Sequence, residues 1–336
     1  MSKDRRRRRA TLGIDIGGTK SLYALFDDTF EVLAEEKLPT HPERGGAGAF
    51  RRAMDAAVGR LIARAGKRGY RIRAVGVGCA GDIDMAAGVV RASPNLPFLD
   101  DYPMGPRLEK LTGARTFVVN DVRAGLYGEF RLGAARKARH AIGVFVGTGV
   151  GGALIVDGRL HLGASGLAGD IGNSLLHAGA PQEQVRKEVL DNVASRTAIA
   201  GDAAALAAKR WAPKLRAAAG TDVTDIGSGD IAAAIRAGDK AVERLVRGRA
   251  AVLGAAISNL VDFINPDAVV LGGGLVAAMP ALIRREVRKA VEAHAARGAA
   301  RAAKIVVARL GDHAVTAGAA CLALDMQSPA PPIDVH

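Results

Sequence analysis

The chain of 336 residues is long enough for two domains, because a single hydrophobic core stops growing near this size. Hydrophobic residues make up 49%, charged residues 24%, and 42 residues are glycine, a composition typical of a soluble α/β protein and not of a disordered or fibrous one. The net charge of +13 includes the run Arg5 to Arg9, and the remaining excess lies in Ala/Arg-rich helices, so we expect solvated helix faces and no specific nucleic-acid surface.

The cysteines and the apolar stretches indicate in which compartment the protein is expected. Cys79 and Cys321 stand far apart in the chain, which argues against a disulfide framework and a thiolate zinc site. The longest uncharged stretches, 141–156 and 268–283, are shorter than the ~18 to 20 residues that cross a bilayer. Asp15 interrupts the first apolar run, so no export signal is expected. We therefore expect a cytoplasmic protein without a membrane segment.

The first half of the chain begins with a hairpin pattern. Residues 11–26 contain two short apolar runs on either side of Gly17-Gly18-Thr19, which is typical of two strands joined by a glycine turn. A third strand is predicted at 31–38 and a helix at 47–67, where apolar residues recur at helical spacing. A strand at 72–77 follows, so this half predicts a ββ(β)αβ unit.

A second unit of the same kind begins at Ala141, with an apolar run, a Gly-rich turn and another apolar run. Helices are predicted at 182–216 and 231–265, followed by a strand at 268–271. Internal repetition indicates a fold built from matching units. The sequence therefore predicts a two-domain α/β fold with duplicated ββ(β)αβαβ halves and an interdomain cleft.

The expected domain bounds follow from this repeat. The first domain is predicted at 10–121 and the second at 122–313. An Ala/Gly-rich helix at 314–326 is expected to pack on the first domain. Residues 1–9 and 327–336 are expected to form disordered tails.

The turn of the first hairpin has the residue types of a phosphate site. Adjacent Gly17 and Gly18 let backbone amides approach phosphate oxygens, and the hydroxyl of Thr19 and the ammonium of Lys20 add donors. Asp15 ends the first strand, where a carboxylate could hold Mg²⁺ through water. The alternative is an ordinary tight hairpin with a polar tip.

The turn of the second hairpin matches the pattern GxGxxG. A dinucleotide site needs a helix to begin on these glycines, whereas the residues that follow form a β-type run. We therefore predict a second phosphate hairpin. Its expected phosphate-binding residues are Gly147, Thr148, Gly149 and Gly151.

A third glycine loop follows the strand at 268–271. Its residues Gly272, Gly273 and Gly274 would let a flat base and a ribose lie against the backbone. Such strand–glycine–helix joints are common in α/β folds, so this loop by itself is weak evidence for a nucleotide site. It indicates such a site only in combination with the two glycine hairpins.

Asp121 stands where a strand at 116–120 ends and a helix begins. It is a candidate general base, and the alternative is an N-cap that stabilises the helix by ~1 kcal/mol. Glu129, on the same helix, is expected to face solvent or to pair with Arg131.

In this order, over residues 11–324, these motifs resemble the ROK family of bacterial sugar kinases and sugar-responsive repressors, within the actin/hexokinase-like (ribonuclease H-like) ATPase fold. The resemblance implies that LGIDIGGTK and FVGTGVGGALIVDGRLHLGASGLAGDIG are phosphate hairpins, that VVNDVRAG carries the catalytic base, and that NPDAVVLGGG borders the adenosine. It implies ATP and a sugar as substrates, Mg²⁺ as the metal and a homodimer. By the same resemblance, Asp121 accepts the proton of the attacking hydroxyl, while Gly81, Asn95 in SPNLPF, and Asn120 position the sugar.

The chain departs from the family pattern around the sugar. Where family kinases usually have Glu-x-Gly-His, this chain has Asp170, Gly172 and Asn173, and a Leu-Glu that touches the sugar corresponds to Leu190-Asp191. The zinc segment is replaced by HAGAPQEQVRKE, whose single His177 cannot supply four ligands, so no zinc is expected. Sugar contacts through water, a bulkier amino-sugar acceptor and reduced catalysis all remain open.

Three alternatives concern the function. A sugar-sensing repressor would need a DNA-binding domain ahead of the first hairpin, and the roughly ten residues before it are too few. Polyphosphate could replace ATP as donor; the basic surface favours polyphosphate, and the loop at Gly272 favours a nucleotide. Glucose is the expected acceptor and an N-acetylated hexosamine the alternative.

Overall fold

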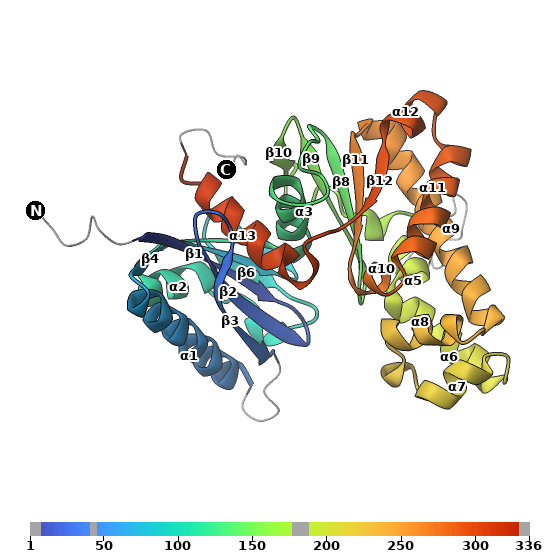
Figure 1. Cartoon of the computed structure of the whole chain (residues 1–336), viewed down its shortest axis with the longest axis horizontal. Coiled ribbons are helices and arrows are strands. Elements are labelled where there is room, and N and C mark those ends of the chain that lie inside the picture. Colours follow the sequence, from blue (N-terminus) through green and yellow to red (C-terminus); the bar gives the residue numbers. More distant parts are fainter. Residues whose placement is uncertain (1–7, 41–45, 177–187, 329–336) are drawn as a thin grey trace, which may run out of the picture. The chain divides into compact units, whose positions relative to one another are not determined.

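The computed structural model describes residues 8–40, 46–176 and 188–328 (Figure 1). These residues divide into two compact units. Of the described residues, the first unit comprises 8–40, 46–136, 158–162 and 309–328, and the second comprises 137–157, 163–176 and 188–308.

The first unit contains a five-stranded sheet of order β3-β2-β1-β4-β7. β1 and β2 form the expected antiparallel hairpin, and β4 and β7 run parallel to β1. Parallel pairing brings the carboxyl ends of β1, β4 and β7 to one edge, where Asp15 pairs in register with Gly78, and Cys79 with Asn120. The strands are β1 (Arg8–Ile16), β2 (Lys20–Phe26), β3 (Val32–Pro39), β4 (Tyr70–Cys79) and β7 (Arg115–Asn120).

Helices cover both faces of this sheet because alternate strand residues are apolar on both sides. On one face, α1 (Gly46–Lys67) and α2 (Met104–Thr112) pack over the alternating side chains of β1 and β4. On the other, α13 (Ala314–Asp325) packs over Ala24, Phe26 and Ala74 (Figure 1). A two-stranded sheet of β5 (Asp82–Asp84) and β6 (Val89–Ala92), followed by the 3-10 helix η2 (Pro97–Leu99), completes the unit.

Small residues allow α13 to lie against backbone. A Cβ on Gly318 would come within 1.8 Å of the Ala124 carbonyl oxygen in α3 (Asp121–Arg131), and a Cβ on Gly76 within 1.9 Å of the Ala319 oxygen. Because α3 packs against α13 in this way, the division between the units falls after residue 136 and not after the expected residue 121.

Two expectations for the first unit need correction. Arg8 and Arg9 lie in β1, where they pair with Tyr70 and Arg71, and not in a tail. Glu129, expected at the surface, is fully buried: its carboxylate accepts backbone N–H groups of Ala134 at 2.7 Å, of Arg309 at 2.7 Å and of Leu310 at 2.8 Å. Arg131 pairs instead with Asp325.

The second unit repeats the architecture of the first. Its strands belong to a sheet of order β10-β9-β8-β11-β12, in which β8 and β9 form an antiparallel hairpin and β11 and β12 run parallel to β8. The short edge strand β10 belongs to the segment 158–162, which is grouped with the first unit. The two sheets thus share one strand order, which confirms the predicted duplication. The strands are β8 (Ala141–Val146), β9 (Val150–Val156), β10 (Arg159–His161), β11 (Ala268–Gly272) and β12 (Lys304–Val307).

Helices pack on one face of the second sheet, against Ile142, Val144 and Val269 (Figure 1). The single helix predicted at 231–265 is divided into two helices, because Gly238 between them has a positive φ of 99°. Of the helices predicted within 182–216, residues 182–187 lie outside the described part of the chain, and Pro213 begins the last helix. The helices are α5 (Leu190–Ala194), α6 (Arg196–Ala208), α7 (Pro213–Ala219), α8 (Ser228–Arg236), α9 (Lys240–Ile264), α10 (Gly274–Ala278), α11 (Pro280–His294) and α12 (Arg297–Ala302).

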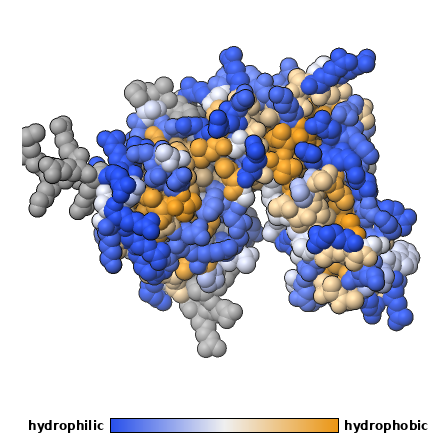
Figure 2. Space-filling model, in the orientation of Figure 1, coloured by the Kyte–Doolittle hydropathy of each residue, from blue (hydrophilic) through white to orange (hydrophobic). Residues whose placement is uncertain are grey.

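The face shown in Figure 2 carries many hydrophilic residues, with apolar areas between them. Many of the arginines that make the chain basic form ion pairs at the surface, such as Arg60 with Glu36 and Arg285 with Glu286. Among the described residues, no helix combines the length and the apolar character needed to span a bilayer.

Candidate active site

The turn between β1 and β2 is narrow and open to solvent. The N–H of Gly17 donates to the Lys20 oxygen at 3.2 Å, and the Thr19 oxygen accepts the N–H of Thr40 at 2.9 Å. Thr19 and Lys20 are exposed. A Cβ on Gly18 would lie 3.6 Å from the Cβ of Asn95, so the turn lies beside the loop expected to contact the sugar.

Two carboxylates, Asp15 and Asp121, interact at the carboxyl ends of the parallel strands. The pKa of Asp15 is raised to about 8, first by burial and then by the Asp121 carboxylate, against the opposing effect of Lys20. Burial also raises the pKa of Asp121 above its ordinary value. A divalent cation would relieve the repulsion between these groups, and oxygen ligands suit Mg²⁺, so the residues fit the expected metal.

Asp121 occupies the first turn of α3, and the N-cap of this helix is Asn120. The Asn120 Oδ1 accepts the N–H of Val122 at 3.0 Å, and its Nδ2 donates to the Gly81 oxygen at 3.2 Å. One oxygen of Asp121 also accepts the Val122 N–H at 3.0 Å. Because Asn120 already caps the helix, Asp121 is not required as the N-cap.

The loop that carries Asn95 is held by hydrogen bonds within the first unit. Ser93, which is buried, donates its hydroxyl to the Ala80 oxygen at 2.7 Å, and its N–H donates to Asp100 at 2.8 Å. Gly81 has a φ of 125°, and a Cβ there would lie 2.2 Å from the Ala92 oxygen. Asn95 itself is exposed. Sequence reasoning missed Ser93 and Asp100, because a serine and an aspartate in a polar loop give no signal of their own.

The first unit therefore brings together, at one sheet edge, the residues predicted there for phosphate, metal and sugar. They are Asp15, Gly17, Gly18, Thr19, Lys20, Gly81, Asn95, Asn120 and Asp121.

The second hairpin turn is held by residues 191–197. Asp191 accepts the N–H of Val150 at 2.5 Å, the N–H of Arg196 donates to the Gly147 oxygen at 2.9 Å, and the Thr197 hydroxyl donates to the Thr148 oxygen at 2.8 Å. The chain continues as β9 from Val150 and not as a helix, so GxGxxG here belongs to a hairpin. Asp191, expected at the sugar, thus accepts a hydrogen bond from the second glycine hairpin.

Asp170 and Asn173 lie together at the 3-10 helix η3 (Ile171–Asn173), where the Asn173 amide donates to Asp170 at 2.6 Å. Both side chains are exposed, and Gly172 packs against the Val150 oxygen, to which a Cβ would come within 2.2 Å. His177 lies outside the described residues, as do the other residues of the replaced zinc segment up to 187. Among the described residues, no group of three His, Cys, Asp or Glu side chains could hold a metal ion.

The third glycine loop lies directly on the end of β8. Gly273 has a φ of 86°, and a Cβ there would lie 2.4 Å from the Val146 oxygen. Around Gly274 the space is more open, with Ser228 Oγ at 3.8 Å from the position of a Cβ. In the second unit, the loop expected at the adenosine therefore adjoins the second glycine hairpin.

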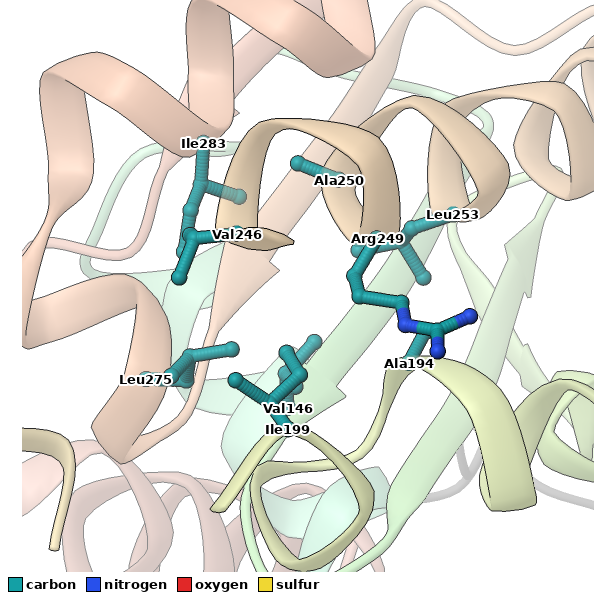
Figure 3. A pocket seen from close by; sticks show the side chains of 9 residues that line it. All are labelled: Val146, Ala194, Ile199, Val246, Arg249, Ala250, Leu253, Leu275 and Ile283. Atoms are coloured by element: carbon teal, nitrogen blue, oxygen red, sulfur yellow. The ribbon is translucent and has the colours of Figure 1, made fainter. Parts of the chain in front are cut away.

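A small apolar cavity lies in the core beneath this hairpin (Figure 3). It encloses about 10 Å³, which is room for about one water molecule and far below the ~300 to 1,000 Å³ of a ligand pocket. The cavity is therefore a packing defect and not a substrate site. Its lining side chains are Val146, Ala194, Ile199, Val246, Arg249, Ala250, Leu253, Leu275 and Ile283.

Two units with one strand order, each beginning with a glycine hairpin, define a two-domain protein of the actin-like ATPase class.

Comparisons with known proteins specify the class further. The sequence model of the ROK family matches residues 11–326. The glucokinase of Halalkalibacterium halodurans is 30% identical over 312 residues, which are 91% of this chain and 92% of the relative. The N-acetylmannosamine kinase of Citrobacter koseri is 32% identical over 270 residues, 79% of this chain and 83% of the relative. The structure of a ROK family glucokinase from Streptomyces griseus, in complex with glucose and AMPPNP, superposes on this chain with a TM-score of 0.78 and 29% sequence identity. The superposition covers 94% of this chain and 99% of the S. griseus chain. This chain belongs to the ROK family.

Proposed function

We propose that this carbohydrate kinase transfers the γ-phosphoryl group of Mg·ATP to a hydroxyl of a hexose, with Asp121 as the general base. The observation that carries the proposal is the position of Asp121 in the first unit, at the same sheet edge as Asp15 and Asn120. The relatives named glucokinase and N-acetylmannosamine kinase support a hexose or an N-acetylated hexosamine as acceptor.

In this mechanism, the residues mainly position groups and balance charge, as phosphoryl transfer requires. Asn95 and Asn120 would orient the sugar so that its hydroxyl faces the Asp121 carboxylate. The raised pKa of Asp121 makes its carboxylate a better proton acceptor than an exposed aspartate. Bound Mg²⁺ would neutralise phosphate charge, and Asp15 is the residue of this chain that would hold it through water.

The amides of the glycine hairpins would bind the phosphate chain. In the first unit this is the amide of Gly18, beside the Thr19 hydroxyl, because the Gly17 N–H already donates to the Lys20 oxygen and holds the turn. In the second unit they are those of Gly149 and Gly151, beside the Thr148 hydroxyl, because the Gly147 N–H already donates to the Gly149 oxygen. Gly272, Gly273 and Gly274 would border the adenosine.

Glucose is the proposed acceptor, and an N-acetylated hexosamine is the second candidate. The second candidate is supported by the pairing of Asp170 with Asn173, since two short side chains that bond to each other leave room for a larger substituent. Mg²⁺ without zinc, a homodimer and a cytoplasmic location complete the proposal; the homodimer and the location rest on the sequence analysis alone.

The test is a coupled ADP-release assay with Mg·ATP and a panel of hexoses, hexosamines and N-acetylated hexosamines. Asp121→Asn should stay folded and bind ATP but turn over ~10² times more slowly or worse. Asp28→Asn is the matched control, because Asp28 lies in the same unit with its side chain 61% exposed, beyond the opposite end of β2. A nearly normal rate in Asp121→Asn would remove Asp121 from the base role.

Two further outcomes would change the proposal. Sugar binding without turnover over the whole panel would indicate a non-catalytic sugar sensor. Faster turnover with polyphosphate than with ATP, and a steeper loss of that rate with salt, would indicate polyphosphate as the donor.

A further inference from the structure

The two hairpins differ in their charged residues. The first turn ends in Lys20, whereas the second turn, Gly147 to Gly152, contains no cationic residue. A turn that binds a chain of phosphates gains much from a cation, because hydrogen bonds from a charged donor are about twice as strong as neutral ones. A cation for the second hairpin must therefore come from another element.

Arg196 is placed to supply this cation. It is the first residue of α6, and its Nη2 donates to Thr148 Oγ1 at 3.3 Å while its backbone N–H donates to the Gly147 oxygen at 2.9 Å. The N-cap Ser195 fixes the start of the helix by accepting the N–H of Ala198 at 3.2 Å. Backbone and side chain of Arg196 are thus both attached to the tip of the hairpin.

The charge of Arg196 is not neutralised within the described part of the chain, where no carboxylate forms an ion pair with it. Two other cations, by contrast, are paired with carboxylates: Lys20 lies 3.1 Å from Asp312, and Arg249 lies 2.6 Å from Asp202. A guanidinium carries five N–H donors. With one of them on Thr148, the others can bind phosphate oxygens in the two-pronged geometry typical of arginine.

The end of α6 adds to this site. Its first turn lies at the positive end of the helix dipole, which favours an anion. The hydroxyl of Thr148 adds a second donor beside the Arg196 guanidinium. We infer that Arg196 binds the phosphate chain of the phosphoryl donor at the second hairpin. This inference rests on the proposed function and deepens it, because it names the residue that recognises the donor.

The experiment compares Arg196→Gln, Arg196→Lys and the wild type. In Arg196→Gln, the KM for ATP should rise about tenfold or more, while the KM for the sugar stays unchanged, because one charged donor is lost. Arg196→Lys should recover part of the affinity. Arg236→Gln is the matched control. Arg236 is exposed and lies in the last turn of α8, so this substitution removes the same charge from the same unit.

The salt dependence separates binding from packing. If Arg196 binds phosphate, the rise of KM for ATP with salt should be less steep in Arg196→Gln than in the wild type. If Arg196 only supports the hairpin through Thr148, the slope should not change. An unchanged slope would overturn the inference. A thermal unfolding transition in each variant shows that the variant is folded. If Arg196→Gln does not fold, the same salt dependence is measured with Arg196→Lys.

Direct binding keeps the inference distinct from the proposed function. Calorimetry with Mg·ADP and with tripolyphosphate measures donor affinity without turnover, so an enzyme that phosphorylates no tested sugar can still be compared with Arg196→Gln. Weaker binding of either ligand in the variant supports the inference, and the ligand that the wild type binds more tightly identifies the donor class. Equal binding in variant and wild type, or no binding of either ligand by the wild type, would overturn it.

Discussion

Glu129→Gln is expected to destabilise the first unit strongly, although it changes one atom. The carboxylate is fully buried and accepts three backbone N–H groups, two on Oε1 from Arg309 and Leu310 and one on Oε2 from Ala134. A glutamine keeps one acceptor oxygen and directs its NH₂ group at the remaining N–H. At least one backbone donor then loses its partner.

The magnitude follows from these bonds. A hydrogen bond to a charged group contributes ~1.5 to 3 kcal/mol, and a buried donor left without a partner costs ~1 to 3 kcal/mol. We expect a loss of about 3 kcal/mol or more in the free energy of unfolding of this unit. At ~2 to 4 °C per kcal/mol for a unit of this size, its Tm should fall by about 6 to 12 °C.

The assay is differential scanning calorimetry, which can resolve the two units if they unfold separately. Glu292→Gln is the control, because the Glu292 side chain is 59% exposed and lies 4.0 Å from Arg288, so the change should be within ~0.5 kcal/mol. A Tm loss in Glu129→Gln no larger than in Glu292→Gln would refute the assignment of these hydrogen bonds to the stability of the unit.

Three other predictions concern charge and packing. Because the folded-state pKa of Asp15 is raised to about 8, its stabilising effect is present below the unfolded-state pKa of ~4 and is lost as pH rises through 8. Asp15→Asn should therefore gain Tm relative to the wild type as pH rises from 6 to 9 while losing activity, and a pH-independent Tm difference would contradict this. Gly318→Ala should lower stability by several kcal/mol, since a Cβ would lie 1.8 Å from a backbone oxygen, whereas Gly59→Ala in α1, with nothing within 4 Å, should raise stability by up to ~1 kcal/mol. Equal Tm values for these two variants would count against the packing of α13. Asp312 lies 3.1 Å from Lys20 and would compete with the phosphates of ATP for this cation. Asp312→Asn should therefore lower the KM for ATP a few-fold at low salt, and the same KM in variant and wild type would exclude such competition.

Much of the fold was predictable because its signals are local. A glycine turn between two apolar runs predicts a hairpin from adjacent residues, and both predicted hairpins, at Gly17 and at Gly147, are present. The division of the single helix predicted at 231–265 was not foreseen, because the break lies at one residue, Gly238, whose positive φ of 99° ends the helical conformation. The repeat of the two units was also visible in the sequence, because each repeats the same order of turns and runs.

The candidate site was predictable as a set of loops but not as contacts. The sequence placed Asp121 at the end of a strand, and the parallel pairing of β1, β4 and β7 brings it beside Asp15. It did not show that Asp191 binds the hairpin at Val150, since the two lie 41 residues apart. Nor did it single out Arg196, whose neighbour Thr148 is 48 residues away.

The sequence by itself determined the strands, the turns and the residue types offered to phosphate, metal and sugar, because turn formation and apolar spacing depend on neighbours in the chain. Only the tertiary structure decided the burial of Glu129 and the unit to which α3 belongs. Glu129 is buried by backbone groups 180 and 181 residues later in the chain, and α3 is held by the glycines of α13. Such contacts depend on how distant segments pack, and no local pattern in the sequence records them.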